Sequence, residues 1–164
     1  MMRGYAAIGL VRPKSPGNVG GAMRAAHCYG ASMVAIESDR TSGKYFMGSP
    51  LDTPNAWKHI PTLHTHNLRE LVPHGCVPVA VDLVEGAVAL PSFQHPARAF
   101  YVFGPEDGTL GRRHLDWCAH KVMIPMRGCS NLAATVNVIL YDRLAKAERY
   151  SRGIRNSDLV ETAA

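Results

Sequence analysis

The sequence lacks the features that mark membrane proteins, disulfide scaffolds and zinc sites. No apolar run approaches the ~18 residues that a membrane-spanning helix needs, and residues 1–12 lack the cleavage site of a secretory signal peptide. The four cysteines lie far apart and form no C-x-x-C pair, which argues against a zinc site and a small disulfide framework. We therefore expect a cytoplasmic protein with free thiols and no membrane partner.

Common signatures of nucleotide and metal binding are missing as well. The sequence contains neither G-x-G-x-x-G nor G-x-x-x-x-G-K-[ST], so neither a dinucleotide-binding motif nor a P-loop is indicated. Among the eight histidines, His64 and His66 share one face of an expected strand, but no third ligand has a suitable spacing. We therefore expect no metal.

The composition that is present fits one globular domain. With 164 residues, 46% of them hydrophobic, the chain can bury a core without disulfides or metals. We expect residues 1–150 to form a single domain and residues 151–164 to form a flexible C-terminal tail. The net charge of +5 permits a polyanionic partner such as nucleic acid but does not require one.

Apolar runs alternate with helical patterns along the chain. Strands are expected at residues 4–11, 32–37, 62–65, 77–82, 97–103 and 121–124. Helical segments are expected at residues 18–29, 54–58, 67–72, 111–117 and 131–150, with a long loop over residues 38–54. This alternation predicts an α/β fold with a mostly parallel sheet and helices on both faces.

Three polar stretches follow expected strands: PGNVGGAMR, FGPEDG and IPMRGCSN. Ligands of parallel sheets bind beyond the carboxyl ends of the strands, so the stretches predict one pocket made of three loops. In the first, Asn18 is a candidate helix N-cap, and Arg24 near a helix start suits a phosphate. The alternative is a capped helix with a surface arginine.

The other two stretches also allow a structural explanation. Glu106 can hold a hydroxyl or a cationic group, or can belong to an ordinary acidic turn. Asn131 can cap the last helix, and a cysteine such as Cys129 is more often a small buried hydrophobe than a nucleophile. No histidine and aspartate pattern accompanies Cys129, so nucleophilic cysteine catalysis is not favoured.

Together and in this order, the stretches resemble the motifs of the SpoU family of RNA ribose methyltransferases, within the trefoil-knotted SPOUT class. The family motifs are Asn-x-Gly followed by arginine, Phe-Gly-x-Glu followed by glycine, and Ile-Pro-Met before a Ser-x-Asn that opens the last helix. The matching residues are Asn18, Gly20, Arg24, Phe103, Gly104, Glu106, Gly108, Ile124, Pro125, Met126 and Asn131. Cys129 departs from the family's usual serine, and the neighbouring Ser130 is a possible substitute.

The resemblance implies a fold, a cofactor and a reaction. It implies a C-terminal trefoil knot that binds S-adenosylmethionine. It also implies an enzyme that transfers the methyl group of this cofactor to a ribose 2′-hydroxyl. The minimal members of the family act as homodimers on tRNA, including at the wobble ribose. The cofactor-binding residues implied are Asp82, Gly104, Ile124, Met126, Cys129, Asn131 and Leu132.

The resemblance also assigns catalytic and RNA-binding roles. Arg24 is the implied base or orients an RNA phosphate, Asn18 and Glu106 hold Arg24 and the loops, and Ser130 and Asn131 line the site. The candidates for gripping RNA are Arg3, Arg12, Lys14, Arg40 and Lys44. The alternatives are methylation of a base or of ribosomal RNA, a non-catalytic RNA-binding relative, and an unrelated α/β nucleotide-binding protein.

Overall fold

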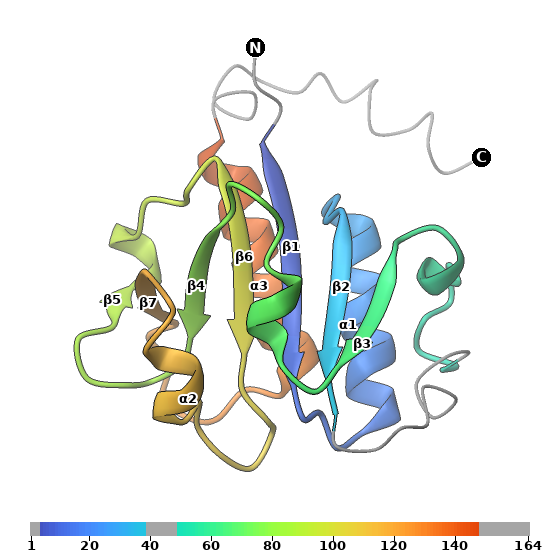
Figure 1. Cartoon of the computed structure of the whole chain (residues 1–164), viewed down its shortest axis with the longest axis horizontal. Helices are drawn as coiled ribbons and strands as arrows, with labels where there is room; N and C mark the ends of the chain where they lie inside the picture. The colour runs from blue at the N-terminus through green and yellow to red at the C-terminus, as the bar shows by residue number, and fades with distance from the viewer. Residues whose placement is uncertain (1–3, 39–48, 148–164) are drawn as a thin grey trace.

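A seven-stranded parallel sheet forms the centre of the molecule (Figure 1). The computed structural model describes residues 4–38 and 49–147. The strands are β1 Tyr5–Val11, β2 Met33–Glu37, β3 Thr62–Thr65, β4 Val77–Val81, β5 Val88–Ala89, β6 Arg98–Phe103 and β7 His120–Met123. Their order is β3-β2-β1-β6-β4-β7-β5, and every pairing among the described strands is parallel. The predicted parallel α/β sheet is confirmed.

Helices lie on both faces of the sheet, as the alternation predicts, but they cover the faces unequally. The α-helices are α1 Pro16–Cys28, α2 Arg112–Leu115 and α3 Leu132–Lys146, and the 3-10 helices are η2 Ala56–Lys58, η3 Leu68–Leu71 and η4 Leu90–Ser92. The two long helices, α1 and α3, pack side by side behind the sheet in Figure 1, while the short α2 lies in front of it. No helix in residues 4–38 and 49–147 is long and apolar enough to cross a membrane.

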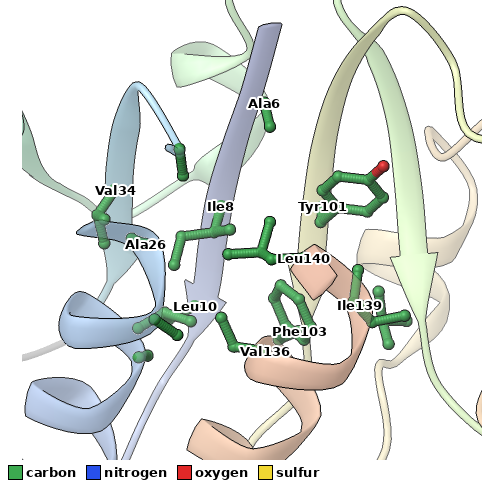
Figure 2. Packing of buried hydrophobic residues seen from close by; sticks show 14 of the residues in the cluster. Ala6, Ile8, Leu10, Ala26, Val34, Tyr101, Phe103, Val136, Ile139 and Leu140 are labelled. Atoms are coloured by element: carbon green, nitrogen blue, oxygen red, sulfur yellow. The ribbon is translucent and has the colours of Figure 1, made fainter. Parts of the chain in front are cut away.

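The larger hydrophobic core lies between the sheet and the two long helices (Figure 2). In α3 the buried residues Leu132, Val136, Ile139 and Leu140 recur at helical spacing and form one apolar stripe. They pack against alternate residues of β1 such as Ile8. Intervening β1 residues, with Phe100, Leu68 and Leu110, form the core on the opposite face. Burial on both faces explains why the central strands read as continuous apolar runs.

Two helix ends differ from the sequence-based expectation. The N-cap of α1 is Ser15 rather than Asn18, because Pro16 occupies the first turn and the Ser15 hydroxyl accepts a hydrogen bond from the Asn18 amide at 3.4 Å. The predicted cap at Asn18 is therefore wrong. Helix α3 ends at Lys146, four residues before the expected position. The expected tail at residues 151–164 lies outside the described residues.

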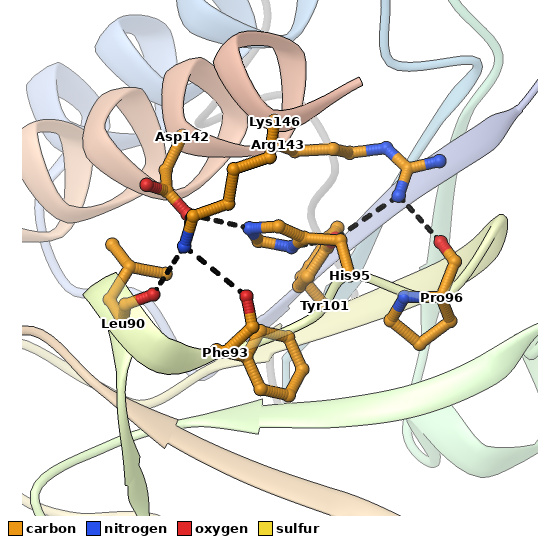
Figure 3. A network of polar contacts seen from close by, with 8 residues as sticks. All are labelled: Leu90, Phe93, His95, Pro96, Tyr101, Asp142, Arg143 and Lys146. Carbon is orange, nitrogen blue, oxygen red and sulfur yellow. Dashed lines mark hydrogen bonds and ion pairs between the residues drawn. The ribbon is translucent and has the colours of Figure 1, made fainter. Parts of the chain in front are cut away.

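A polar network fixes the last turns of α3 to the segment before β6 (Figure 3). His95 lies between Tyr101 and Asp142, with its Nδ1 2.7 Å from the Tyr101 hydroxyl and its Nε2 2.8 Å from Asp142 Oδ2. Arg143 donates hydrogen bonds to the carbonyl oxygens of Pro96, Tyr5 and Ala97. These contacts fix the C-terminal end of α3, and its N-terminal end lies beside the loops described next.

Candidate active site

A cavity of about 500 Å³ opens where the loops after β4, β6 and β7 meet the first turn of α3. This is the carboxyl edge of the sheet, as predicted from the three polar stretches. Eight of the expected site residues line it: Asp82, Gly104, Glu106, Ile124, Met126, Cys129, Ser130 and Leu132. Of the three stretches expected to form one pocket, FGPEDG and IPMRGCSN contribute to the lining, whereas PGNVGGAMR does not and the loop after β4 takes its place. The size of the cavity is ordinary for a small organic ligand.

Asp82 ties two walls of the cavity together. Its Oδ1 accepts a hydrogen bond from the Leu83 amide at 2.7 Å, and its Oδ2 accepts one from the Leu110 amide at 2.5 Å. The first bond closes the turn after β4, and the second reaches the loop after β6. Both carboxylate oxygens are thus engaged by backbone, so Asp82 shapes the cavity through the positions of these loops.

Glu106 joins the loop after β6 to the start of α1. Its Oε1 accepts hydrogen bonds from Asn18 Nδ2 at 2.8 Å and from the Ser15 amide at 3.3 Å, and its Oε2 accepts one from the Lys14 amide at 3.0 Å. Burial raises the pKa of Glu106, but the hydrogen bonds from Asn18 and from the two backbone amides outweigh it and hold the pKa below its ordinary value. The carboxylate therefore stays ionised near neutral pH.

Arg24 lies on the exposed side of α1 and does not line the cavity. Its guanidinium forms no hydrogen bond or ion pair with the described residues. Asn18 also lies outside the lining, and it reaches the site through Glu106. The nearby Gly20 serves packing within the chain, because a Cβ there would lie 2.2 Å from the Ser49 hydroxyl oxygen.

The loop after β7 supplies both the N-cap of α3 and part of the cavity wall. Asn131 caps α3 through a hydrogen bond from the Ala134 amide to its Oδ1 at 2.7 Å, and it does not line the cavity. Cys129 and Ser130 are exposed and line the cavity beside it. The structure thus shows the capping function of Asn131 that the sequence allowed, and it leaves the Cys129 thiol accessible.

Several cavity residues carried no recognisable sequence signal. Leu83 is one of them, and it is 75% exposed directly after Asp82. Thr109 and Thr135 complete the lining from the β6 loop and α3. Leu83 could have been noticed as an apolar residue directly after a strand end, but the threonines become recognisable only once the loops are folded together.

The match to known protein families bears directly on this geometry. A family model describing the SpoU rRNA methylases matches residues 5–141. The chain belongs to this family. All three motif stretches of this SpoU-family chain fall within the matched region, which confirms the resemblance drawn from their order and spacing. No curated protein sequence matches it significantly.

Solved structures share the fold. One titled as an RNA 2′-O ribose methyltransferase has a TM-score of 0.73 at 23% identity, covering 88% of this chain and 57% of that one. AviRb, a SpoU methyltransferase from Streptomyces viridochromogenes solved with AdoMet, has a TM-score of 0.73 at 21% identity, covering 94% of this chain and 61% of that one. This SpoU-family chain therefore spans less than two thirds of either.

A third structure is close to this chain in length. It comes from work titled as structural insights into the 2-OH methylation of C/U34 on tRNA. Its TM-score is 0.71 at 23% identity, and the match covers 88% of this chain and 97% of that one. At these identities the likeness establishes the fold.

Proposed function

We propose that this SpoU-family chain is an S-adenosylmethionine-dependent RNA methyltransferase that modifies a ribose 2′-hydroxyl, with tRNA as its substrate. The observation that carries the proposal is the cavity at the carboxyl edge, which the second and third family motifs line and to which the first is joined by the hydrogen bond from Asn18 to Glu106. The neighbour solved with AdoMet and the neighbour concerned with C/U34 of tRNA support the choice of cofactor and substrate.

The cavity residues fit the cofactor. Its volume of about 500 Å³ lies within the range of small-molecule sites. Its wall combines apolar side chains such as Ile124 and Leu132 with the backbone of Gly104, which has no side chain to obstruct a ligand. Bound there, S-adenosylmethionine supplies an activated methyl group. Asp82 and Glu106 keep the surrounding loops in position through the hydrogen bonds described above.

Arg24 is the residue that would act on RNA. A ribose hydroxyl is a weak nucleophile near neutral pH, so its proton must be accepted during attack. A free guanidinium stays protonated in proteins, which favours an Arg24 that binds an RNA phosphate and aligns the hydroxyl, with that phosphate accepting the proton. Its exposed position, with no hydrogen bond or ion pair to the part of the chain that the structure describes, suits this role. Ser130 and Cys129, which line the cavity, would contact the ribose or the cofactor.

The proposal includes the wider organisation that the family resemblance implies: a C-terminal trefoil knot, a homodimer and a cytoplasmic location. One observation supports dimerisation. On α3, Val138 is 41% exposed and Tyr141 is 59% exposed, and Tyr141 makes an edge-to-face contact with Tyr29 of α1 at 6.2 Å between ring centroids. These apolar groups share the helical side of the sheet and would be covered by a second copy.

Three measurements test the proposal in sequence. Isothermal titration with S-adenosylmethionine should show binding, and its absence would reject the methyltransferase. Transfer of a labelled methyl group should be detected on bulk tRNA and should exceed transfer to ribosomal RNA. Mass spectrometry of the digested nucleosides should find a 2′-O-methylated ribose, while a methylated base would support the alternative acceptor. Binding without any transfer would indicate a non-catalytic relative.

The Arg24→Ala variant separates catalysis from cofactor binding. Because Arg24 does not line the cavity, its loss should leave the affinity for S-adenosylmethionine unchanged. Methyl transfer should fall severely, because the hydroxyl is no longer aligned. Near-normal turnover in this variant would remove Arg24 from the mechanism.

A further inference from the structure

Four arginines occupy segments that meet at the carboxyl edge, outside the cavity. Building on the proposed function, we propose that Arg12, Arg69, Arg112 and Arg113, here called the arginine surface, bind the phosphate backbone of the RNA substrate. All four are exposed. They come from the loop after β1, from η3 and from α2, and so they do not form a charge run in the sequence.

The buried Glu37 holds these three segments together. It ends β2 and is 2% exposed. Its backbone oxygen accepts a hydrogen bond from the Arg12 amide at 2.8 Å. Its Oε2 accepts one from the Leu68 amide at 3.0 Å, and its Oε1 lies 2.9 Å from His114 Nε2. The first contact is made by Arg12 itself. The other two are made by Leu68, which precedes Arg69, and by His114, which follows Arg113.

The Glu37 carboxylate is ionised although it is buried. Burial raises the pKa of Glu37, but hydrogen bonds from His114 and the Leu68 amide, together with the charge of Arg113, outweigh it and lower the pKa. The ionised carboxylate is enclosed and does not face solvent. The exposed acids in the same segments are Glu70 and Asp116, so the four arginines leave an excess of positive charge.

The guanidinium groups are largely free to bind a ligand. Arg113 donates one hydrogen bond from Nη2 to the His66 carbonyl oxygen at 2.8 Å, which orients the group and leaves most of its five donors unused. The side chains of Arg12, Arg69 and Arg112 form no hydrogen bond or ion pair within residues 4–38 and 49–147. Lys14, by contrast, pairs with Asp107. A guanidinium that is held in position, as that of Arg113 is, suits phosphate oxygens.

The backbone at Arg12 gives independent support. Its φ is +44°, in the left-handed region that disfavours residues with a side chain. Glycine would adopt this conformation without strain. The Arg12 side chain forms no hydrogen bond or ion pair with residues 4–38 and 49–147, so we infer that a ligand accounts for its presence at such a position. Phosphate is the ligand that matches its charge and donors.

RNA binding measured apart from catalysis tests the arginine surface. The probe is a fluorescein-labelled, unmodified tRNA transcript, whose anisotropy is followed across a series of KCl concentrations. The Arg112→Gln/Arg113→Gln double variant should raise Kd about tenfold and lower the slope of log Kd against log salt by roughly 2, since each lost phosphate contact removes about one released counterion. Arg12→Gly should weaken binding while its melting temperature stays unchanged.

Lys58→Gln is the matched control. Lys58 is exposed on η2, which precedes β3 and so lies towards the amino end of that strand. Its loss removes one positive charge but should leave Kd unchanged. An unchanged Kd in both arginine variants, an equal loss in the Lys58 control, or no measurable binding by the unaltered chain would overturn the proposal.

The outcome does not depend on the proposed reaction. Titration with S-adenosylmethionine and methyl transfer by the unaltered chain are measured separately. RNA binding that weakens as expected in a chain without methyl transfer supports the surface and rejects the enzyme. Normal methyl transfer with an unchanged Kd in both arginine variants supports the enzyme and rejects the surface.

Discussion

Replacing Glu106 with glutamine removes the charge that joins the loop after β6 to the start of α1. The carboxylate accepts three hydrogen bonds: from Asn18 Nδ2 at 2.8 Å, from the Lys14 amide at 3.0 Å and from the Ser15 amide at 3.3 Å. A glutamine side chain has a single oxygen. Its nitrogen must therefore face at least one of these donors, whichever way the amide is turned.

The size of the loss follows from these contacts. Hydrogen bonds to charged groups contribute about 1.5–3 kcal/mol and neutral ones about 0.5–1.5 kcal/mol. Two bonds that lose their charge assistance, and a third that becomes a donor–donor contact, would cost more than 2 kcal/mol in a dry interior. Solvent reaches the half-buried Glu106, so we expect about 1–2 kcal/mol. In a chain of this length that lowers Tm by roughly 2–8 °C.

The difference in the free energy of unfolding between the unaltered chain and Glu106→Gln should decrease at low pH. The pKa of Glu106 in the folded chain lies below its ordinary value of 4.5, so between the two values the unfolded chain binds more protons. The contribution of Glu106 is therefore complete above pH 4.5 and is lost as the pH falls through the folded value. Urea unfolding of both proteins from pH 7 to pH 3 measures this change.

Glu70→Gln is the control for this experiment. Glu70 also accepts a hydrogen bond from an asparagine, at 3.0 Å from Asn67 Nδ2, but the contact is exposed. Its loss should change the free energy of unfolding by less than about 0.5 kcal/mol. The reasoning is refuted if Glu106→Gln costs no more than this control, or if its cost stays constant down to pH 3. The affinity for S-adenosylmethionine should also fall in Glu106→Gln, because Glu106 lines the cavity.

Three further changes have expected outcomes. Burial lowers the pKa of His95 despite its carboxylate partner, so the folded state loses stability as the pH falls below about 6.5. Urea unfolding should show this loss, and His95→Gln should abolish it. Gly20→Ala forces a Cβ against Ser49 and should lower the free energy of unfolding by about 1–3 kcal/mol. At Gly111 an added Cβ would meet nothing within 4 Å, so Gly111→Ala should be nearly neutral by the same assay. Equal costs of the two variants would contradict the packing argument. Cys129→Ser should keep or raise methyl transfer with an unchanged Tm, and a large loss would show that the thiol itself is required.

Local patterns carried most of the information about the secondary structure. The apolar runs at residues 4–11 and 97–103 correspond to β1 Tyr5–Val11 and β6 Arg98–Phe103, because a strand buried on both faces needs apolar residues throughout. Short elements were missed. The two-residue β5 and the adjacent η4 have too few residues to show a period, and β5 is recognisable only through its pairing with β7.

The site was predictable to the extent that its residues lie in contiguous motifs. The positions of Gly104, Glu106 and Ile124 after strands indicated a shared pocket, and the motif order indicated the SpoU family. The error at Asn18 has a clear cause. Both Ser15 and Asn18 are good N-caps, and only the folded chain shows Asn18 engaged by Glu106, 88 positions away.

By itself, the sequence determined the parallel α/β alternation, the family and two of the loops that form the cavity, those after β6 and β7, because each depends on neighbouring residues. Tertiary structure decided which groups meet across long separations: Asp82 with the Leu110 amide, Glu106 with the start of α1, and Glu37 with His114. These pairs depend on strand order and on how the loops pack, which no local pattern specifies. The arginine surface is a product of that packing, since its members become neighbours only around Glu37.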